Sequence, residues 1–179
     1  GVEEARRRFG RVLVHRSVEA EAALSFTGLS DLLVPVFQDV AVKPAPLRRR
    51  ALEVALLLAE PGKEPPDPRA IGLALLDVLQ MRAAREPVVL ALDDLQWLDS
   101  ATAGALHMAL RRLQDERVAV LATVRTASDT TVPSELDRSF PRDRLVRLPL
   151  GPLSIGALHH LLRQRVGLEL TRAELARVQ

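Results

Sequence analysis

The feature that most limits how this chain can fold is an unbroken apolar run, Val88 to Leu92, that ends in two carboxylates, Asp93 and Asp94. A run without alternating polar residues is typical of a strand buried on both faces of a parallel sheet. In such sheets, ligands bind just beyond the carboxyl ends of the strands. The run therefore predicts a parallel α/β fold with a binding site at the edge where the two carboxylates lie.

Strand-like and helix-like segments alternate along the rest of the chain. Further strands are predicted over 11–15, 118–124 and 144–148. Helix signals are found over 47–59, after Asp67-Pro68, after the cap residue Ser100, from Ser154 to Gly167, and after the capping box of Thr171 and Glu174. The alternation predicts a three-layer α/β fold with a mostly parallel sheet.

Composition excludes several classes of function. The 179 residues suit one domain, or one domain with a small helical appendage, and carry a formal net charge of +2. No cysteine is present, which excludes disulfides, thiolate metal sites and cysteine nucleophiles. A nucleic-acid reader usually has a basic stripe with interleaved aromatic residues, and this sequence has none. Because no membrane span or signal peptide is recognised, a cytoplasmic protein without membrane contact is expected.

The two carboxylates suit metal-dependent phosphate chemistry. A carboxylate at the end of a buried strand can hold Mg²⁺, usually through waters, while the ion bridges two phosphates. An adjacent carboxylate can orient or deprotonate an attacking water. Asp93 and Asp94 fit these two roles, although a buried strand that ends in two solvated aspartates is the alternative interpretation.

Thr123 and Arg125 follow the next predicted strand and form a second candidate feature. The planar guanidinium of an arginine matches phosphate oxygens well, so Arg125 could contact a terminal phosphate. The alternative is an ordinary surface arginine. The four histidines are isolated or badly spaced for a shared metal, and solvated or half-buried side chains are expected for them.

A phosphate-binding glycine loop is not found. The pair Gly62-Lys63 has Leu57 where the loop needs glycine and Glu64 where it needs Ser or Thr. No other segment fits the pattern. Since the chain starts at Gly1 and stops within a predicted helix at Gln179, we expect an internal piece of a longer protein.

Four sequence blocks occur in an order that resembles a known family. They are Glu19 to Phe26, Asp93-Asp94-Leu95-Gln96-Trp97-Leu98-Asp99, Leu121 to Arg125, and Leu150 to Ser154. Together they resemble the ATPase domain of large LuxR-type bacterial transcriptional regulators, within the STAND group of AAA-like signalling ATPases. The resemblance covers nearly the whole chain, and the block that begins with Asp93 is the most specific.

The resemblance implies ATP and Mg²⁺ as ligands and a role for each matching residue. Asp93 would be the Walker B ligand of Mg²⁺, and Asp94 the acidic residue that handles the water. Arg125 would read the terminal phosphate, and Pro152 would lean on the adenine. Residues 1–150 would be a partial P-loop ATPase core, and residues 151–179 the start of a helical lid.

The same resemblance implies a sheet with strand order 5-1-4-3-2. The central strand, which leads into the glycine loop, is missing from this sequence. The strand at 144–148 is then expected either beside that empty position or against the strand at 118–124. The isolated chain is not expected to turn over ATP, and DNA binding would need a downstream domain. Self-association of the intact protein is left open.

Two other interpretations remain at this point. The chain could be a non-catalytic remnant that serves only as a packing or interaction domain. It could also come from a related STAND ATPase fused to a cyclase or kinase domain. The flanking sequence would separate these cases, because a glycine loop just upstream supports an ATPase switch.

Overall fold

The computed structural model describes residues 11–37, 44–63, 65–125, 136 and 138–178, and the statements below concern these residues. The chain divides into two compact units, Gly1–Leu145 and Val146–Gln179. The first unit contains the sheet and its helices. The second unit contains two helices and is described by itself.

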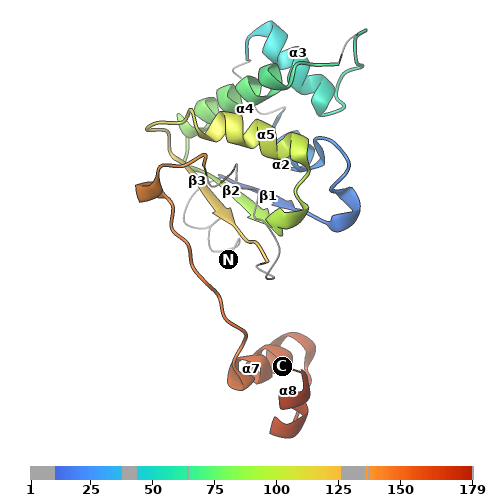
Figure 1. Cartoon of the computed structure of the whole chain (residues 1–179), viewed down its shortest axis with the longest axis vertical. Coiled ribbons are helices and arrows are strands. Elements are labelled where there is room, and N and C mark those ends of the chain that lie inside the picture. The colour runs from blue at the N-terminus through green and yellow to red at the C-terminus, as the bar shows by residue number, and fades with distance from the viewer. Residues whose placement is uncertain (1–10, 38–43, 64, 126–135, 137, 179) are drawn as a thin grey trace. The chain divides into compact units, whose positions relative to one another are not determined.

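A parallel three-stranded sheet forms the centre of the first unit (Figure 1). Its strands are β1 (Arg11–Arg16), β2 (Val88–Asp93) and β3 (Val118–Ala122), and β2 lies between the other two. Arg16 lies opposite Asp93 and Leu92 lies opposite Ala122. The parallel α/β fold class is thus confirmed, and the order of these strands agrees with the 4-3-2 part of the expected sheet.

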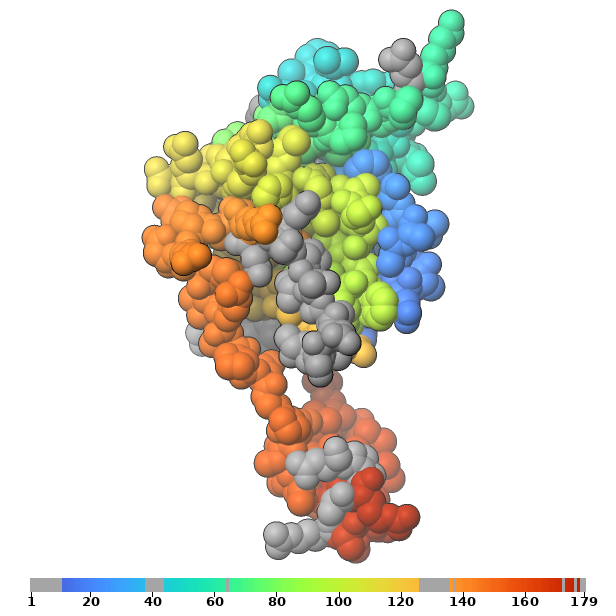
Figure 2. Space-filling model, in the orientation of Figure 1, coloured from blue at the N-terminus to red at the C-terminus, as the bar shows by residue number. Residues whose placement is uncertain are grey.

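Four helices pack above the sheet in the view of Figure 1. They are α2 (Thr27–Phe37), α3 (Pro46–Ala55), α4 (Pro68–Ala83) and α5 (Ser100–Leu110). Three short 3₁₀ turns are η1 (Glu19–Glu21), η2 (Leu95–Trp97) and η3 (Arg142–Arg144). Figure 2 shows residues near 140–145 lying against the segment between α5 and β3, where the Arg144 guanidinium donates a hydrogen bond to the carbonyl of Gln114.

The pleat of β2 explains why its sequence is apolar throughout. Val88, Leu90 and Leu92 face the main core together with leucines of the helices. Val89 and Ala91 lie on the opposite face, where they form a small buried cluster with Val12 of β1. Both faces of β2 are therefore buried, as the unbroken apolar run predicts.

The helix α4 begins and packs as its sequence indicates. The Asp67 carboxylate accepts a hydrogen bond from the Arg69 N–H at 2.8 Å, and Pro68 occupies the first helical position. The residues spaced for one helix face are all buried, namely Ile71, Leu75, Val78 and Leu79. This helix therefore presents a continuous apolar face to the core.

The second unit contains α7 (Ile155–Val166) and α8 (Arg172–Val178). The Ser154 hydroxyl accepts a hydrogen bond from the Ala157 N–H, and Gly167 ends α7 at a left-handed φ of 71°. The Thr171 N–H donates to the Glu174 carboxylate, and the Glu174 N–H donates back to the Thr171 hydroxyl. The predicted caps of both helices are therefore confirmed.

The predicted strand over 144–148 is wrong. Arg144 ends the turn η3, and residues 145–150 adopt no regular secondary structure. Val146 and Leu148 are 79% and 77% exposed, so this segment buries little apolar surface. None of the three strands of the described sheet pairs with this segment. An extended segment without a neighbour gains no ladder hydrogen bonds.

The apolar sequence over 118–124 also predicts a buried strand, and the structure corrects this expectation. The strand β3 is not buried on both faces, because Leu121 is 50% exposed at an edge of the described sheet. The apolar segment from Leu29 to Phe37, for which no element is predicted, is helical, with Pro35 inside α2. No helix among the described residues is long and apolar enough to cross a membrane.

The crossing of α4 and α5 supplies a test of the fold. A Cβ atom added at Gly72 would lie 2.9 Å from Met108 Cβ, so Gly72→Ala should force the two helices apart. We expect a loss of about 1–3 kcal/mol in the free energy of unfolding, measured by chemical denaturation. The control Gly104→Ala meets nothing within 4 Å and should stabilise α5 by about 0.5–1 kcal/mol. Equal effects of both substitutions would contradict the described packing.

Candidate functional site

The carboxyl ends of β2 and β3 bring the predicted polar residues to one edge of the sheet. Asp93 is the last residue of β2, and Thr123 follows β3. The Thr123 N–H donates to the Leu92 carbonyl at 2.9 Å, so the pairing of the strands continues one residue further. This places the Thr123 hydroxyl beside Asp93, to whose Oδ1 it donates a hydrogen bond.

Asp94 turns the chain sharply out of the strand. Its φ and ψ are 57° and 51°, in the left-handed region, which costs a residue other than glycine about 1–2 kcal/mol. Two hydrogen bonds hold this conformation. The Asp94 N–H donates to Thr123 Oγ1 at 3.0 Å, and the Leu95 N–H donates to the Thr123 carbonyl at 2.9 Å. As a consequence, Asp93 and Asp94 have different side-chain partners.

Arg125 pairs with Asp94 through a forked contact. Its Nε lies 3.0 Å from Asp94 Oδ1, and its Nη2 lies 3.5 Å from Asp94 Oδ2. Gln96 joins both residues, because its Nε2 donates to Asp94 Oδ1 at 2.9 Å and its Oε1 accepts from the Arg125 N–H at 3.1 Å. The Arg125 side chain remains 74% exposed, so its guanidinium is open to a ligand.

The hydrogen bond from Gln96, followed by the hydrogen bond and charge of Arg125, lowers the pKa of Asp94 from its ordinary value of 3.8. Asp94 is therefore ionised at neutral pH. An ionised carboxylate accepts hydrogen bonds and donates none, which suits a group that orients a water.

Asp93 could take part in a magnesium site. Its side chain is 50% exposed, and the Arg16 Nε lies 3.8 Å from its Oδ2. Within the described residues there is no group of three His, Cys, Asp or Glu side chains that could hold a metal. Mg²⁺ is commonly bound by one or two carboxylates with waters and substrate phosphates. The exposed carboxylate oxygens of Asp93 fit this pattern as metal ligands, and they do not fit a metal site made of protein groups alone.

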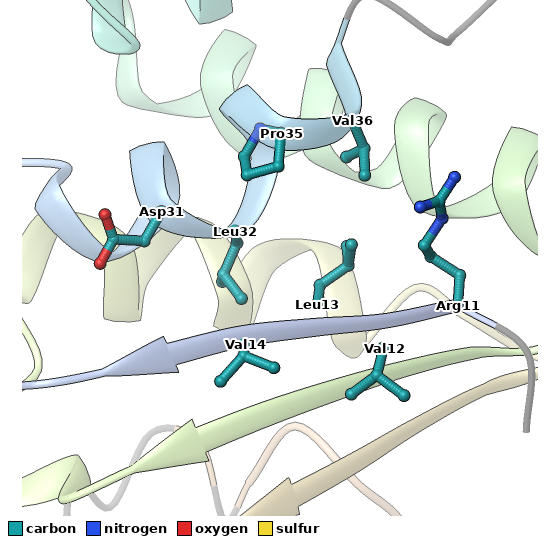
Figure 3. Close-up of a pocket in the computed structure, with 8 residues that line it drawn as sticks. All are labelled: Arg11, Val12, Leu13, Val14, Asp31, Leu32, Pro35 and Val36. Carbon is teal, nitrogen blue, oxygen red and sulfur yellow. The ribbon is translucent and has the colours of Figure 1, made fainter. Parts of the chain in front are cut away.

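A cavity of about 420 Å³ lies elsewhere, between β1 and α2 (Figure 3). Arg11 and Asp31 lie toward opposite ends of it, and the side chains of Leu32 and Pro35 descend from α2. None of the predicted site residues lines this cavity. The candidate site therefore lies outside this cavity, at the carboxyl edge of β2 and β3.

The last residue of the acidic block, Asp99, has a structural role that the sequence interpretation missed. Its carboxylate is 3% exposed and accepts hydrogen bonds from the N–H groups of Phe26, Gly28 and Thr102. It therefore caps α5 and also holds the beginning of α2. The predicted cap Ser100 is wrong, since it is the first residue of the helix. The sequence did contain a signal for this cap, because Asp99 directly precedes Ser100 and aspartate is a preferred N-cap residue.

Two other side chains differ from expectation, since the sequence predicts Trp97 as a core anchor and His15 as a solvated or half-buried ring. Trp97 is only partly buried, and the buried residues that anchor this segment in the core are Leu95 and Leu98. His15 is buried at 3% exposure and shares a hydrogen bond of 2.9 Å with Asp31, whereas a solvated or half-buried ring was expected. Sequence interpretation could not find this pair, because the two residues lie on different elements.

A comparison with protein families supplies an identification. The model of the AAA ATPase domain family matches residues 2–121, which is more than half of the chain. The chain belongs to the AAA ATPase domain family. The matched part of this AAA ATPase domain includes Asp93 and Asp94 but ends before Arg125 and Pro152. Comparisons with curated proteins and with solved structures gave no match. Pro152 is exposed in the second unit, and its role stays a prediction.

The contact of Arg125 with Asp94 predicts a change in titration. A carboxyl group whose pKa is lowered by folding stabilises the protein above its unfolded pKa, and this contribution is lost as the pH falls through the folded pKa. Arg125→Met should raise the pKa of Asp94 toward 3.8, measured from carboxyl ¹³C chemical shifts. The control is Arg144→Met, because the Arg144 guanidinium lies 4.0 Å from Asp115. This variant should leave the pKa of Asp94 unchanged. An unaltered pKa in the Arg125 variant would contradict the pairing.

The capping role of Asp99 predicts a large loss of stability. Asp99→Ala leaves three backbone N–H groups without their carboxylate partner, two of them in buried surroundings. The free energy of unfolding should fall by about 2–4 kcal/mol. Ser100→Ala, at the adjacent exposed position, should change it by less than about 0.5 kcal/mol. A larger effect at Ser100 than at Asp99 would restore the original cap assignment.

Proposed function

We propose that this AAA ATPase domain binds Mg²⁺-ATP at the carboxyl edge of the sheet and takes part in its hydrolysis. The observation that carries the proposal is the gathering of Asp93, Asp94 and Arg125 at the ends of two adjacent parallel strands. In open α/β sheets, this edge is where ligands bind. An arginine and two carboxylates there match the charges of a nucleotide with its metal ion.

Asp93 is the proposed ligand of Mg²⁺. Its Oδ1 is fixed by the Thr123 hydroxyl, while its side chain stays half exposed. Bound Mg²⁺ would neutralise charge on the phosphates that it bridges. The nearby Arg16 guanidinium adds positive charge at the same edge, and it would have to share Asp93 with the ion.

Asp94 and Arg125 have complementary proposed roles. Asp94 would accept a hydrogen bond from the attacking water, which suits its ionised state. Arg125 would contact the terminal phosphate through a guanidinium that is already exposed. In the present structure the same guanidinium is held by Asp94, so phosphate binding and the ion pair would compete for it.

The remaining parts of the nucleotide site are proposed from the resemblance. Pro152 would contact the adenine, with residues 151–179 as the start of a helical lid and residues 1–150 as the partial ATPase core. The phosphate loop would be supplied by sequence outside these 179 residues, because none of them fits its pattern. The isolated chain would then bind nucleotide weakly and lack turnover, since that loop supplies most backbone N–H contacts to phosphate.

We further propose that the domain belongs to a LuxR-type transcriptional regulator of the STAND group, a cytoplasmic protein in which ATP sets a switch. The blocks Leu121 to Arg125 and Leu150 to Ser154 support this proposal. DNA would be bound through another domain of that protein. The alternatives are a non-catalytic interaction domain and a STAND ATPase fused to a cyclase or kinase. The neighbouring sequence distinguishes all three.

The separate roles of the two carboxylates can be tested in the full-length protein. Asp93→Asn should weaken Mg²⁺-dependent binding of a fluorescent ATP analogue by about tenfold or more, because a metal ligand loses its charge. Asp94→Asn should spare binding and lower kcat by about 10²-fold, which is typical of a lost proton-handling group. Binding titrations and phosphate release are measured in parallel.

The control is Asp77→Asn, which removes the charge that pairs with Arg48 on the helical side of the domain. It should leave both binding and kcat unchanged. Equal losses of binding in the Asp93 and Asp94 variants would mean that the carboxylates act as one metal site, and the separate roles would be wrong.

A further inference from the structure

Gln96 occupies a central position among the site residues. Its side-chain amide uses both of its ends, because Nε2 donates to Asp94 Oδ1 at 2.9 Å and Oε1 accepts from the Arg125 N–H at 3.1 Å. It thereby joins Asp94, which directly follows β2, to Arg125, which lies two residues after Thr123 beyond the end of β3. An amide is suited to this bridge because it carries a donor and an acceptor on one rigid group.

The turn that carries Gln96 does not need these side-chain bonds. The Trp97 N–H donates to the Asp94 carbonyl at 2.9 Å, and the Leu98 N–H donates to the Leu95 carbonyl at 3.1 Å. Buried Leu95 and Leu98 hold the same turn against the core. The amide of Gln96 therefore acts on the two site residues and is not required to close the turn.

Asp94 and Arg125 both need such support. Asp94 has a left-handed backbone, and its carboxylate is held by hydrogen bonds from Gln96 and Arg125. The Arg125 side chain is 74% exposed, and its guanidinium is held at this edge by its contact with Asp94. The hydrogen bond from the Arg125 N–H to Gln96 fixes the Arg125 backbone, which limits the positions that the guanidinium can reach.

We propose that Gln96 is a positioning residue that sets the Asp94 carboxylate and the Arg125 guanidinium in one arrangement for ATP hydrolysis. The inference rests on the proposed function. When a terminal phosphate draws Arg125 from Asp94, the Gln96 amide stays on the Asp94 carboxylate and keeps it directed at the water. Gln96 touches neither phosphate nor water in this account, so its effect passes through the two residues that it bonds.

The test uses Gln96→Glu and Gln96→Ala in the full-length protein with Mg²⁺-ATP. Gln96→Glu keeps the shape but places a carboxylate against Asp94, and Gln96→Ala removes both bonds. In both variants kcat should fall about tenfold, because the charge-assisted hydrogen bond from Gln96 to Asp94 is lost. The KM for ATP should stay within about twofold, because neither substitution removes a contact with the nucleotide. The matched control is Gln80→Glu, because Gln80 donates to Glu116 through the same chemistry away from the site.

A second readout does not depend on turnover. Gln96→Ala removes the acceptor of the Arg125 N–H, so hydrogen exchange at that amide should become about tenfold faster or more. Exchange at the Trp97 and Leu98 amides should stay as in the unaltered protein, because their acceptors are backbone carbonyls. A merely structural role would accelerate exchange throughout the turn.

The outcomes separate this inference from the proposed function. If the unaltered protein neither binds nor hydrolyses Mg²⁺-ATP, the proposed function fails and the inference fails with it. If the unaltered protein hydrolyses ATP and both variants keep its kcat, only the positioning role is overturned. A rise in KM without a change in kcat, or loss of folding in both variants, would also overturn it.

Discussion

The arrangement of this domain depends on the hydrogen bonds that the Asp99 carboxylate accepts. The carboxylate is buried, and it accepts hydrogen bonds from N–H groups at the beginnings of two helices that are far apart in sequence. The Thr102 hydroxyl adds a fourth bond by accepting from the Leu29 N–H at 3.0 Å. A charge-assisted bond of this kind is stronger than a neutral one. The end of the acidic block thereby fixes α2 and α5 against each other.

The beginning of the same block fixes the candidate site. Asp93 ends β2 in register with β1, and Asp94 leaves the strand through a left-handed turn that Thr123 of the neighbouring strand stabilises. Seven consecutive residues thus connect the helix caps to the carboxylates at the sheet edge. A shift of the helices would reach the site through this short segment, which links the stability of the core to the geometry of the site.

The sequence predicted the features that depend on local pattern. The buried run of β2, the cap at Asp67 and the capping box of Thr171 needed only neighbouring residues, and the structure contains them. Features that depend on distant partners were missed or wrong. The bonds that Asp99 accepts from Phe26 and Gly28 join residues far apart in sequence, and 144–148 failed as a strand because strand formation needs a neighbour. The bridge by Gln96 also depends on a contact between strands.

The central claim is that Mg²⁺-ATP binds at the carboxyl edge of β2 and β3. It is tested most directly by a crystal structure of the full-length protein with Mg²⁺ and a non-hydrolysable ATP analogue. The account predicts Mg²⁺ beside Asp93 and the Arg125 guanidinium turned from Asp94 to the terminal phosphate. Nucleotide bound in the cavity between β1 and α2, with the Arg125 and Asp94 pair intact, would contradict it.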